Sequence, residues 1–99
     1  SRFVISKGNW ISFKLGASKN DVTGIRVIKE DGTIVASYHN THFGEDGKEG
    51  YMWQYKYQLN NIEDNTICYI EIFDNATGDW GLVAVDSIRT DWGNVEPTF

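Results

Sequence analysis

The sequence predicts an all-β fold, an antiparallel β-sandwich formed by a single domain of residues 1–99. Two observations lead to this prediction. Short alternating or apolar runs are bounded by Gly, Asn and Asp, and no stretch of useful length has helical periodicity. Ten glycines and one proline fit tight turns between short strands. At 99 residues, the chain is long enough for one modest hydrophobic core.

We expect six strands after a short apolar start at residues 3–5. They are residues 10–15, 24–29, 33–38, 51–59, 66–73 and 81–90. The first of them alternates, with Ile11, Phe13 and Leu15 on one face and Trp10, Ser12 and Lys14 on the other. Since each strand of a sandwich turns one face inward, the apolar face is expected to enter the core.

Two local patterns refine this picture. Asp31-Gly32 lies between two β-rich runs, which predicts a hairpin because glycine accepts a positive φ. Aromatic side chains recur at every second residue from Tyr51 to Tyr57, so four rings share one strand face. We expect this row to pack in the core rather than form a binding strip, and we expect two or three of the four tryptophans to be buried.

Composition narrows the function classes. The net charge of −5 disfavours nucleic acids and anionic membranes as partners. The single cysteine, Cys68, lies in an apolar run, which predicts a buried, unreactive thiol. No signal peptide or transmembrane run is visible. The chain starts at Ser1 without a methionine, and we expect it to be a piece of a larger multidomain protein.

The segment Asp74–Thr90 (DNATGDWGLVAVDSIRT) carries the most information. A polar turn leads into Trp80-Gly81 and then into an apolar strand that contains Asp86. An unpaired buried carboxylate is very costly, so Asp86 must be exposed or have partners. We favour a structural role, in which Asp86 accepts hydrogen bonds from loop backbone N–H groups and holds neighbouring turns, over a role as a ligand to an ion or a sugar.

This segment resembles the end of the accessory β-sandwich domain of secreted bacterial glycoside hydrolases. The similarity is closest to the extra domain of family 32 fructan hydrolases, the levanases and related β-fructosidases. The matching elements are Ile70–Phe73, Asp74–Gly78, Trp80-Gly81 and Val85-Asp86, with support from Trp10–Ser18 and the hairpin Ile25–Tyr38. Relatives commonly carry a histidine where this chain has Leu82, and they have further sequence before the first strand.

The resemblance implies a galactose-binding-like jelly roll. It also implies a non-catalytic accessory module of an extracellular or cell-surface bacterial enzyme, with carbohydrate, including fructan, and the adjacent domains of the parent chain as partners. The alternative is a structural or interaction domain that packs against a neighbouring catalytic domain. An exposed aromatic ring with polar neighbours would favour sugar binding, whereas a flat apolar patch would favour docking.

The candidate carbohydrate-binding residues are Asn75, Asp79, Trp80 and Arg89, which offer an aromatic platform and hydrogen-bonding groups. The candidate metal ligands are Asp74 and Asp86, for a structural calcium ion that prefers oxygen donors. An Asx-stabilised turn is the favoured explanation of the same acids. No cofactor is required, and no spacing of carboxylates singles out a catalytic pair.

Overall fold

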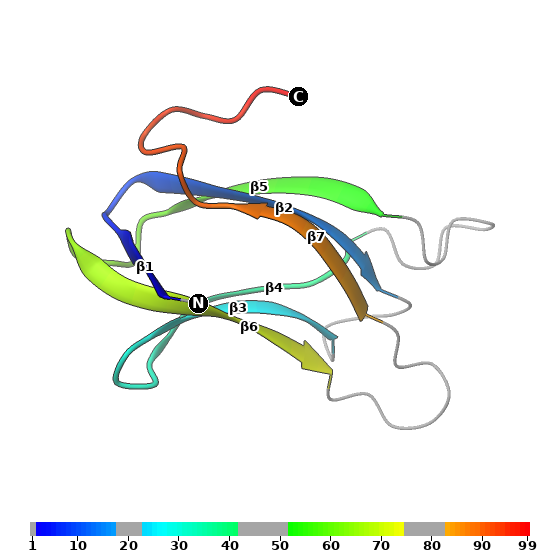
Figure 1. Cartoon of the computed structure of the whole chain (residues 1–99), viewed down its shortest axis with the longest axis horizontal. Helices are drawn as coiled ribbons and strands as arrows, with labels where there is room; N and C mark the ends of the chain where they lie inside the picture. Colours follow the sequence, from blue (N-terminus) through cyan, green and yellow to red (C-terminus); the bar gives the residue numbers. More distant parts are fainter. Residues whose placement is uncertain (1, 18–22, 42–51, 75–82) are drawn as a thin grey trace.

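Two antiparallel sheets face each other across one core, as the sequence predicts. The computed structural model describes residues 2–17, 23–41, 52–74 and 83–99 (Figure 1). The strands are β1 (Arg2–Ile5), β2 (Asn9–Ala17), β3 (Thr23–Lys29), β4 (Ile34–Tyr38), β5 (Trp53–Leu59), β6 (Thr66–Asp74) and β7 (Val83–Arg89). The short apolar start is therefore a strand of its own, and the count of six was one too low for the described residues.

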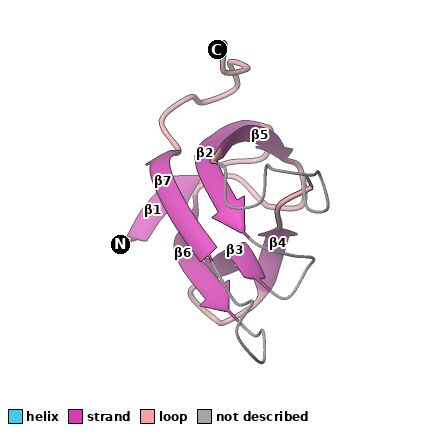
Figure 2. Ribbon diagram, turned by 90° about the vertical axis from the view of Figure 1, so that its right-hand side faces the viewer, coloured by secondary structure: helices cyan, strands magenta, loops and turns pink. Residues whose placement is uncertain are grey.

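The strand order is β1-β6-β3-β4 in one sheet and β5-β2-β7 in the other. Every pairing between described strands is antiparallel. Figure 2 shows the two layers end on, with β1, β6 and β7 along one flank and β4 and β5 along the other. A jelly roll has eight strands, and the described residues hold seven, so the jelly-roll assignment stays a prediction.

The core forms where the inward faces of the two sheets meet. The most deeply buried apolar residues come from β2 and β3 and include Ile11, Phe13, Leu15, Ile25 and Val27, all 0 % exposed. This confirms the face predicted from the alternation in residues 10–15. Cys68 is also buried, as expected for a small apolar side chain.

The predicted hairpin is present. Gly32 has a φ of +90°, and its N–H donates to the carbonyl of Lys29 at 2.9 Å. Asp31 Oδ1 accepts the backbone N–H of Thr33 at 2.9 Å, and hydrogen bonding with the side chain and then the backbone of Thr33 lowers the pKa of the exposed Asp31 carboxyl. The turn between β3 and β4 is thus stabilised by glycine and aspartate in the roles that the sequence indicates.

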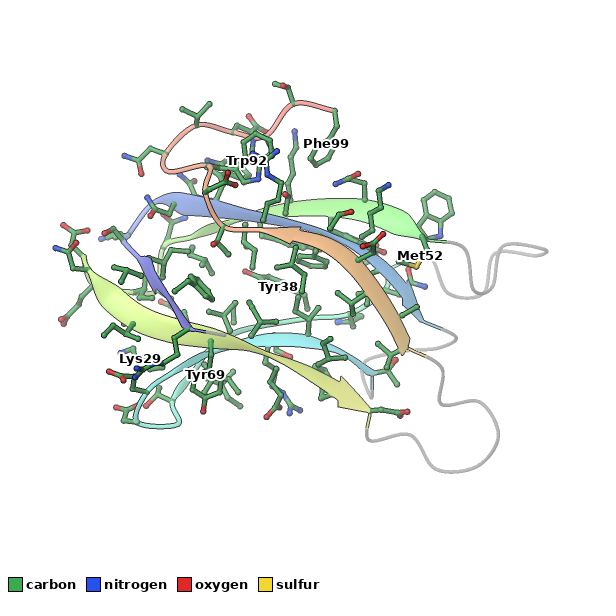
Figure 3. All side chains as sticks on the ribbon, viewed as in Figure 1. Lys29, Tyr38, Met52, Tyr69, Trp92 and Phe99 are labelled. Atoms are coloured by element: carbon green, nitrogen blue, oxygen red, sulfur yellow. The ribbon has the colours of Figure 1, made fainter. Side chains whose placement is uncertain are left out.

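An aromatic cluster fills the flank between β4 and β5. Tyr38 and Tyr57 stack with ring centroids 4.2 Å apart and planes 8° apart, and Phe13 lies within 6.0 Å of both. Tyr55 adds a hydrogen bond, because its hydroxyl donates to Asn40 Oδ1 at 2.7 Å. Figure 3 shows Tyr38 between the sheets. The described part of the aromatic row in β5 therefore packs against the core, as predicted.

The tryptophans differ from expectation. The three described ones, Trp10, Trp53 and Trp92, are half-buried rather than fully buried. The core instead takes its aromatic content from Phe13 and Tyr55. An indole is large, so it is rarely enclosed completely in a domain of this size.

Because the stack of Tyr38 on Tyr57 is partly buried, the free energy of unfolding should decrease at alkaline pH. Burial, with the neighbouring Tyr57, raises the pKa of Tyr38 to about 12. An unfolded tyrosine ionises near pH 10, so between pH 10 and 12 the unfolded chain binds fewer protons than the native one. The stabilisation is complete below pH 10, and we expect about 2 kcal/mol to be lost as pH rises to 12.

Urea unfolding at pH 9 and at pH 11.5 would measure this loss. The variant Tyr38→Phe should retain its stability over that interval better than the wild type. The matched variant Tyr69→Phe, on the outer face of the same sheet, should behave as the wild type does. An equal loss in wild type and Tyr38→Phe would contradict the assignment.

Candidate functional site

Several described strand ends lie together at one end of the sandwich. Val83 lies opposite Ala17, and Asp74 lies opposite Thr23 in the other sheet. Trp53, which lies shortly after residues 42–51, pairs with Leu15 near the same end. The described strand ends that flank residues 18–22, 42–51 and 75–82 are therefore neighbours, on the right in Figure 1. We call this the loop end of the domain.

The predicted carbohydrate-binding residues are not all at the loop end. Asn75, Asp79 and Trp80 lie outside the described residues, but the strands on either side of them, β6 and β7, border the loop end. Arg89 lies at the opposite end of β7, where it pairs with Ser12. It lies six positions along the strand from Val83, which corresponds to about 20 Å. Arg89 therefore lies away from the loop end.

The two predicted calcium ligands lie on different sheets. Asp74 ends β6 in the four-stranded sheet, whereas Asp86 pairs with Lys14 in the three-stranded sheet. Both are exposed. Within residues 2–17, 23–41, 52–74 and 83–99, no group of three His, Cys, Asp or Glu side chains is arranged to hold a metal ion. The calcium site stays a prediction.

Asp86 is exposed and also has a backbone hydrogen-bond partner. Its Oδ1 accepts the N–H of Ser87 at 2.8 Å, and Ser87 has a φ of +55°. The pairing of β2 with β7 shifts register at this point, between Ser12 and Lys14. Serine rarely adopts a positive φ, so the carboxylate compensates for part of the strain of this bulge. The partner belongs to β7 itself rather than to a loop.

Sequence reasoning missed the role of the last nine residues. Residues 91–99, the C-terminal strap, cross the outer face of the three-stranded sheet (Figure 3). Trp92 Nε1 donates to Ser12 Oγ at 2.8 Å, and the N–H of Trp10 donates to the carbonyl of Gly93 at 2.8 Å. Lys56 Nζ donates to the carbonyl of Pro97 at 3.0 Å. These contacts bury Ser12, although it lies on the face predicted to be exposed.

Arg89 is engaged with the start of this strap. Its guanidinium lies 3.9 Å from the centre of the Trp92 ring and donates to both carboxylate oxygens of Asp91, at 3.0 and 3.1 Å. The hydrogen bonds from Arg89 hold the pKa of Asp91 below its usual value. The Arg89 guanidinium and the Trp92 ring thus contact each other, so Arg89 is part of the contact between β7 and the C-terminal strap.

An apolar patch covers part of the outer face of the four-stranded sheet. Directly paired residues share a face of a sheet. Val4 pairs with Ile67, and in the next row Tyr69 pairs with Ile28, which pairs with Ile34. Val4 is 61 % exposed and Ile34 54 %. We call these five residues the outer patch, and Figure 3 shows Tyr69 projecting away from the other sheet.

Ion pairs border the outer patch. Arg2 Nη1 lies 2.7 Å from Glu30 Oε2, and Arg26 Nη1 lies 2.7 Å from Glu71 Oε1. The Arg26 guanidinium also covers the Phe73 ring at 3.8 Å. An apolar centre with a charged border is the usual composition of a protein-binding surface.

A groove opens on the flank between the sheets. It has a volume of about 360 Å³ and is lined by Phe3 of β1, Ile70 and Ile72 of β6, and Ile88 and Thr90 at the end of β7. Ile72 is 53 % exposed although it pairs with the core residue Ile25 and shares its inward face. The groove was not predicted, because it arises where strands distant in the sequence fail to meet.

Comparison with known proteins gives no relative for this chain. No family model matches the sequence, and no curated protein or solved structure matches it. No helix among the described residues is long and apolar enough to cross a membrane. Function must therefore be argued from the residues.

Proposed function

We propose that this domain is a non-catalytic accessory module of a secreted bacterial glycoside hydrolase of the fructan-cleaving type, and that it binds carbohydrate at its loop end. The observation that supports the proposal is that the described strand ends flanking three connecting segments, residues 18–22, 42–51 and 75–82, lie together at that end. Binding residues concentrate on loops held by a rigid scaffold. The segment that carries Asn75, Asp79 and Trp80 is one of the three.

A tryptophan next to carboxylate and amide groups has the chemistry that a sugar requires. The ring packs on apolar C–H faces, and the polar groups bond to hydroxyls. The strands beside this segment are anchored by long antiparallel pairings, β6 with β3 and β7 with β2. Binding energy is therefore not spent on ordering the scaffold.

Calorimetric titration against levan, inulin and common plant glycans tests the proposal. We expect saturable binding to at least one of them. Trp80→Ala should bind at least about tenfold more weakly than the wild type. Phe99→Ala removes a ring that is 64 % exposed in the C-terminal strap, away from the loop end, and should bind as the wild type does. Absence of binding to every glycan, or equal binding by Trp80→Ala, would contradict the proposal.

A second candidate function is docking against a neighbouring catalytic domain of the parent chain. The outer patch favours it, because its exposed members Val4, Ile34 and Ile67 gather on one sheet face, and such apolar groups mark interaction surfaces. Val4→Lys would place a charge at its most exposed position. If this variant lost a stable complex with the catalytic domain while glycans failed to bind the wild type, docking would replace sugar binding as the function.

A further inference from the structure

The C-terminal strap lies over a row of three paired residues on the outer face of the three-stranded sheet (Figure 3). Lys56 of β5 pairs with Ser12 of β2, which pairs with Arg89 of β7. Directly paired residues share a face of a sheet, so the two cations lie on either side of the serine, with about 10 Å between their Cα atoms. We call these three residues the strap seat.

The strap is complementary in charge to the strap seat. Its two acidic residues are Asp91 and Glu96. Asp91 Oδ1 lies 3.0 Å from Arg89 Nε, and Glu96 Oε1 lies 3.1 Å from Lys56 Nζ. Between these pairs, the indole of Trp92 donates to the serine of the seat. Two carboxylates thus meet two cations with an indole between them, so the seat suits an acidic segment that carries an aromatic ring.

Two further contacts indicate that the seat recognises a polypeptide. The backbone N–H of Trp10 donates to the carbonyl of Gly93 at 2.8 Å, and Lys56 Nζ donates to the carbonyl of Pro97 at 3.0 Å. Both acceptors are main-chain carbonyls, which any polypeptide segment offers. Nucleic acids, which are acidic too, are disfavoured by the net charge of −5.

The strap is held mainly by exposed contacts. Both ion pairs join side chains that are at least 36 % exposed, and such pairs add little to stability because water screens them. Pro97 is buried, whereas Val95 is 69 % exposed and Phe99 64 %. Segments with few buried apolar contacts open locally at a lower free energy than the core. We therefore expect the strap to leave its seat while the sandwich stays folded.

We propose that the strap is an intramolecular ligand: it occupies a recognition site for an acidic segment of a partner polypeptide, which carries an indole between two carboxylates and displaces the strap from its seat. While the strap is in place, Ser12 is buried and closed to other chains, so the strap acts as an autoinhibitory contact. The apparent affinity for the partner is reduced by the fraction of molecules in which the strap is open. The proposal uses neither the loop end nor the outer patch, so it stands independently of the proposed function.

Hydrogen exchange of the ¹⁵N-labelled wild-type chain tests whether the strap opens on its own. We expect the indole N–H of Trp92 and the backbone N–H of Trp10 to be protected at least about 100-fold less than the core amides of Phe13 and Val27. Equal protection would show that the strap opens only when the whole domain unfolds, and it would overturn the proposal.

A labelled peptide with the sequence of residues 91–99 tests recognition, with fluorescence anisotropy as the readout. Trp92→Ala weakens the strap of the intact chain, so this variant should bind the peptide at least about tenfold more tightly than the wild type. Val95→Ala changes a strap side chain that is 69 % exposed and should bind as the wild type does. A peptide with asparagine and glutamine in place of its two acids should bind at least about tenfold more weakly.

Two further variants, each made in the Trp92→Ala chain, separate the strap seat from general charge. Lys56→Gln removes a cation of the seat and should weaken peptide binding by about tenfold or more. Lys14→Gln removes a cation from the next row of the same face, where Lys14 pairs with Gln54, and should leave binding unchanged. Both lysines lie on the outer face, so the variants should fold, which circular dichroism would verify.

Three outcomes of these binding experiments would contradict the proposal. No binding of the peptide to Trp92→Ala up to about 1 mM would show that the seat does not accept a segment from outside the chain. Equal effects of Lys56→Gln and Lys14→Gln would show that the peptide responds only to general charge. If the wild type alone formed a concentration-dependent dimer by exchange of straps, the occupant would be a second copy rather than a partner, which sedimentation would detect.

Discussion

Replacing Phe13 by alanine is expected to lower the free energy of unfolding by about 3–5 kcal/mol. Phe13 is 0 % exposed, and its ring lies 5.7 Å from those of Tyr38 and Tyr55 and 6.0 Å from that of Tyr57. Alanine would leave a cavity at the centre of this cluster. The surrounding tyrosines extend from two different sheets, so they cannot collapse into it without moving both strands.

Chemical denaturation and thermal melting would measure this loss. A domain of this size has a total stability of about 5–15 kcal/mol, so Phe13→Ala should melt at least about 15 °C lower or fail to fold at room temperature. If the variant does not fold, Phe13→Leu should show a smaller loss of the same sign. Phe99→Ala provides the control, because its 64 % exposed ring should change stability by less than about 1 kcal/mol. Similar melting temperatures for Phe13→Ala and Phe99→Ala would refute the central role of Phe13.

The fold was predictable where the signal is local. Alternation in residues 10–15 identified the inward face of β2, because a period of two places Ile11, Phe13 and Leu15 on one side. The Asp31-Gly32 pair identified the hairpin, because glycine at a positive φ is required there. Neither inference needs knowledge of distant residues.

The C-terminal strap was not predictable for the opposite reason. Its contacts join Trp92 to Ser12 and Lys56 to Pro97, residues 80 and 41 positions apart. The strap does not pair with the sheet as a regular strand. Its hydrogen bonds go to side chains and to single backbone groups of the sheet below. Burial of Ser12 follows only from this cover, so the outward face of β2 differs from what alternation implies.

For the candidate site residues too, the sequence predicts what depends on local signals and not what depends on long-range contacts. A carboxylate within an apolar strand indicated that Asp86 must be exposed or have partners; it is exposed, and its Oδ1 also accepts the N–H of Ser87. The bulge that places it there has no sequence signal, because serine is not a typical residue for a φ of +55°. Arg89 was chosen for its chemistry alone, and the sequence holds no sign that Trp92 and Asp91 engage it.

Replacing Gly24 by alanine is expected to destabilise the domain by at least about 3 kcal/mol, at or beyond the upper end of the usual cost of overpacking. A Cβ atom at Gly24 would overlap the backbone carbonyl oxygen of Tyr38 and would lie 3.0 Å from its carbonyl carbon. It would also lie 3.2 Å from Cζ of Phe73. A backbone carbonyl cannot rotate away as a flexible side chain can, so β4 would have to separate from β3.

The control distinguishes this overlap from strain in the glycine backbone itself. Gly32 has a φ of +90° but no atom within 4 Å of an added Cβ, so Gly32→Ala should cost only about 1–2 kcal/mol. Gly24 is not among the described residues with a positive φ, and its expected cost is therefore steric. Equal losses in the two variants, measured by urea unfolding, would contradict the close approach of β3 and β4.

The displacement should also reach beyond the substituted position. Tyr38 stacks on Tyr57 with centroids 4.2 Å apart, so movement of its backbone should weaken the near-ultraviolet circular dichroism of the tyrosines even in the folded variant. Gly24 follows Thr23, which lies at the loop end opposite Asp74. If carbohydrate binds there, Gly24→Ala should weaken binding under conditions where the variant remains folded, whereas Gly32→Ala, in the hairpin turn between β3 and β4, should not. That difference would link the close packing of β3 against β4 to the geometry of the proposed binding end.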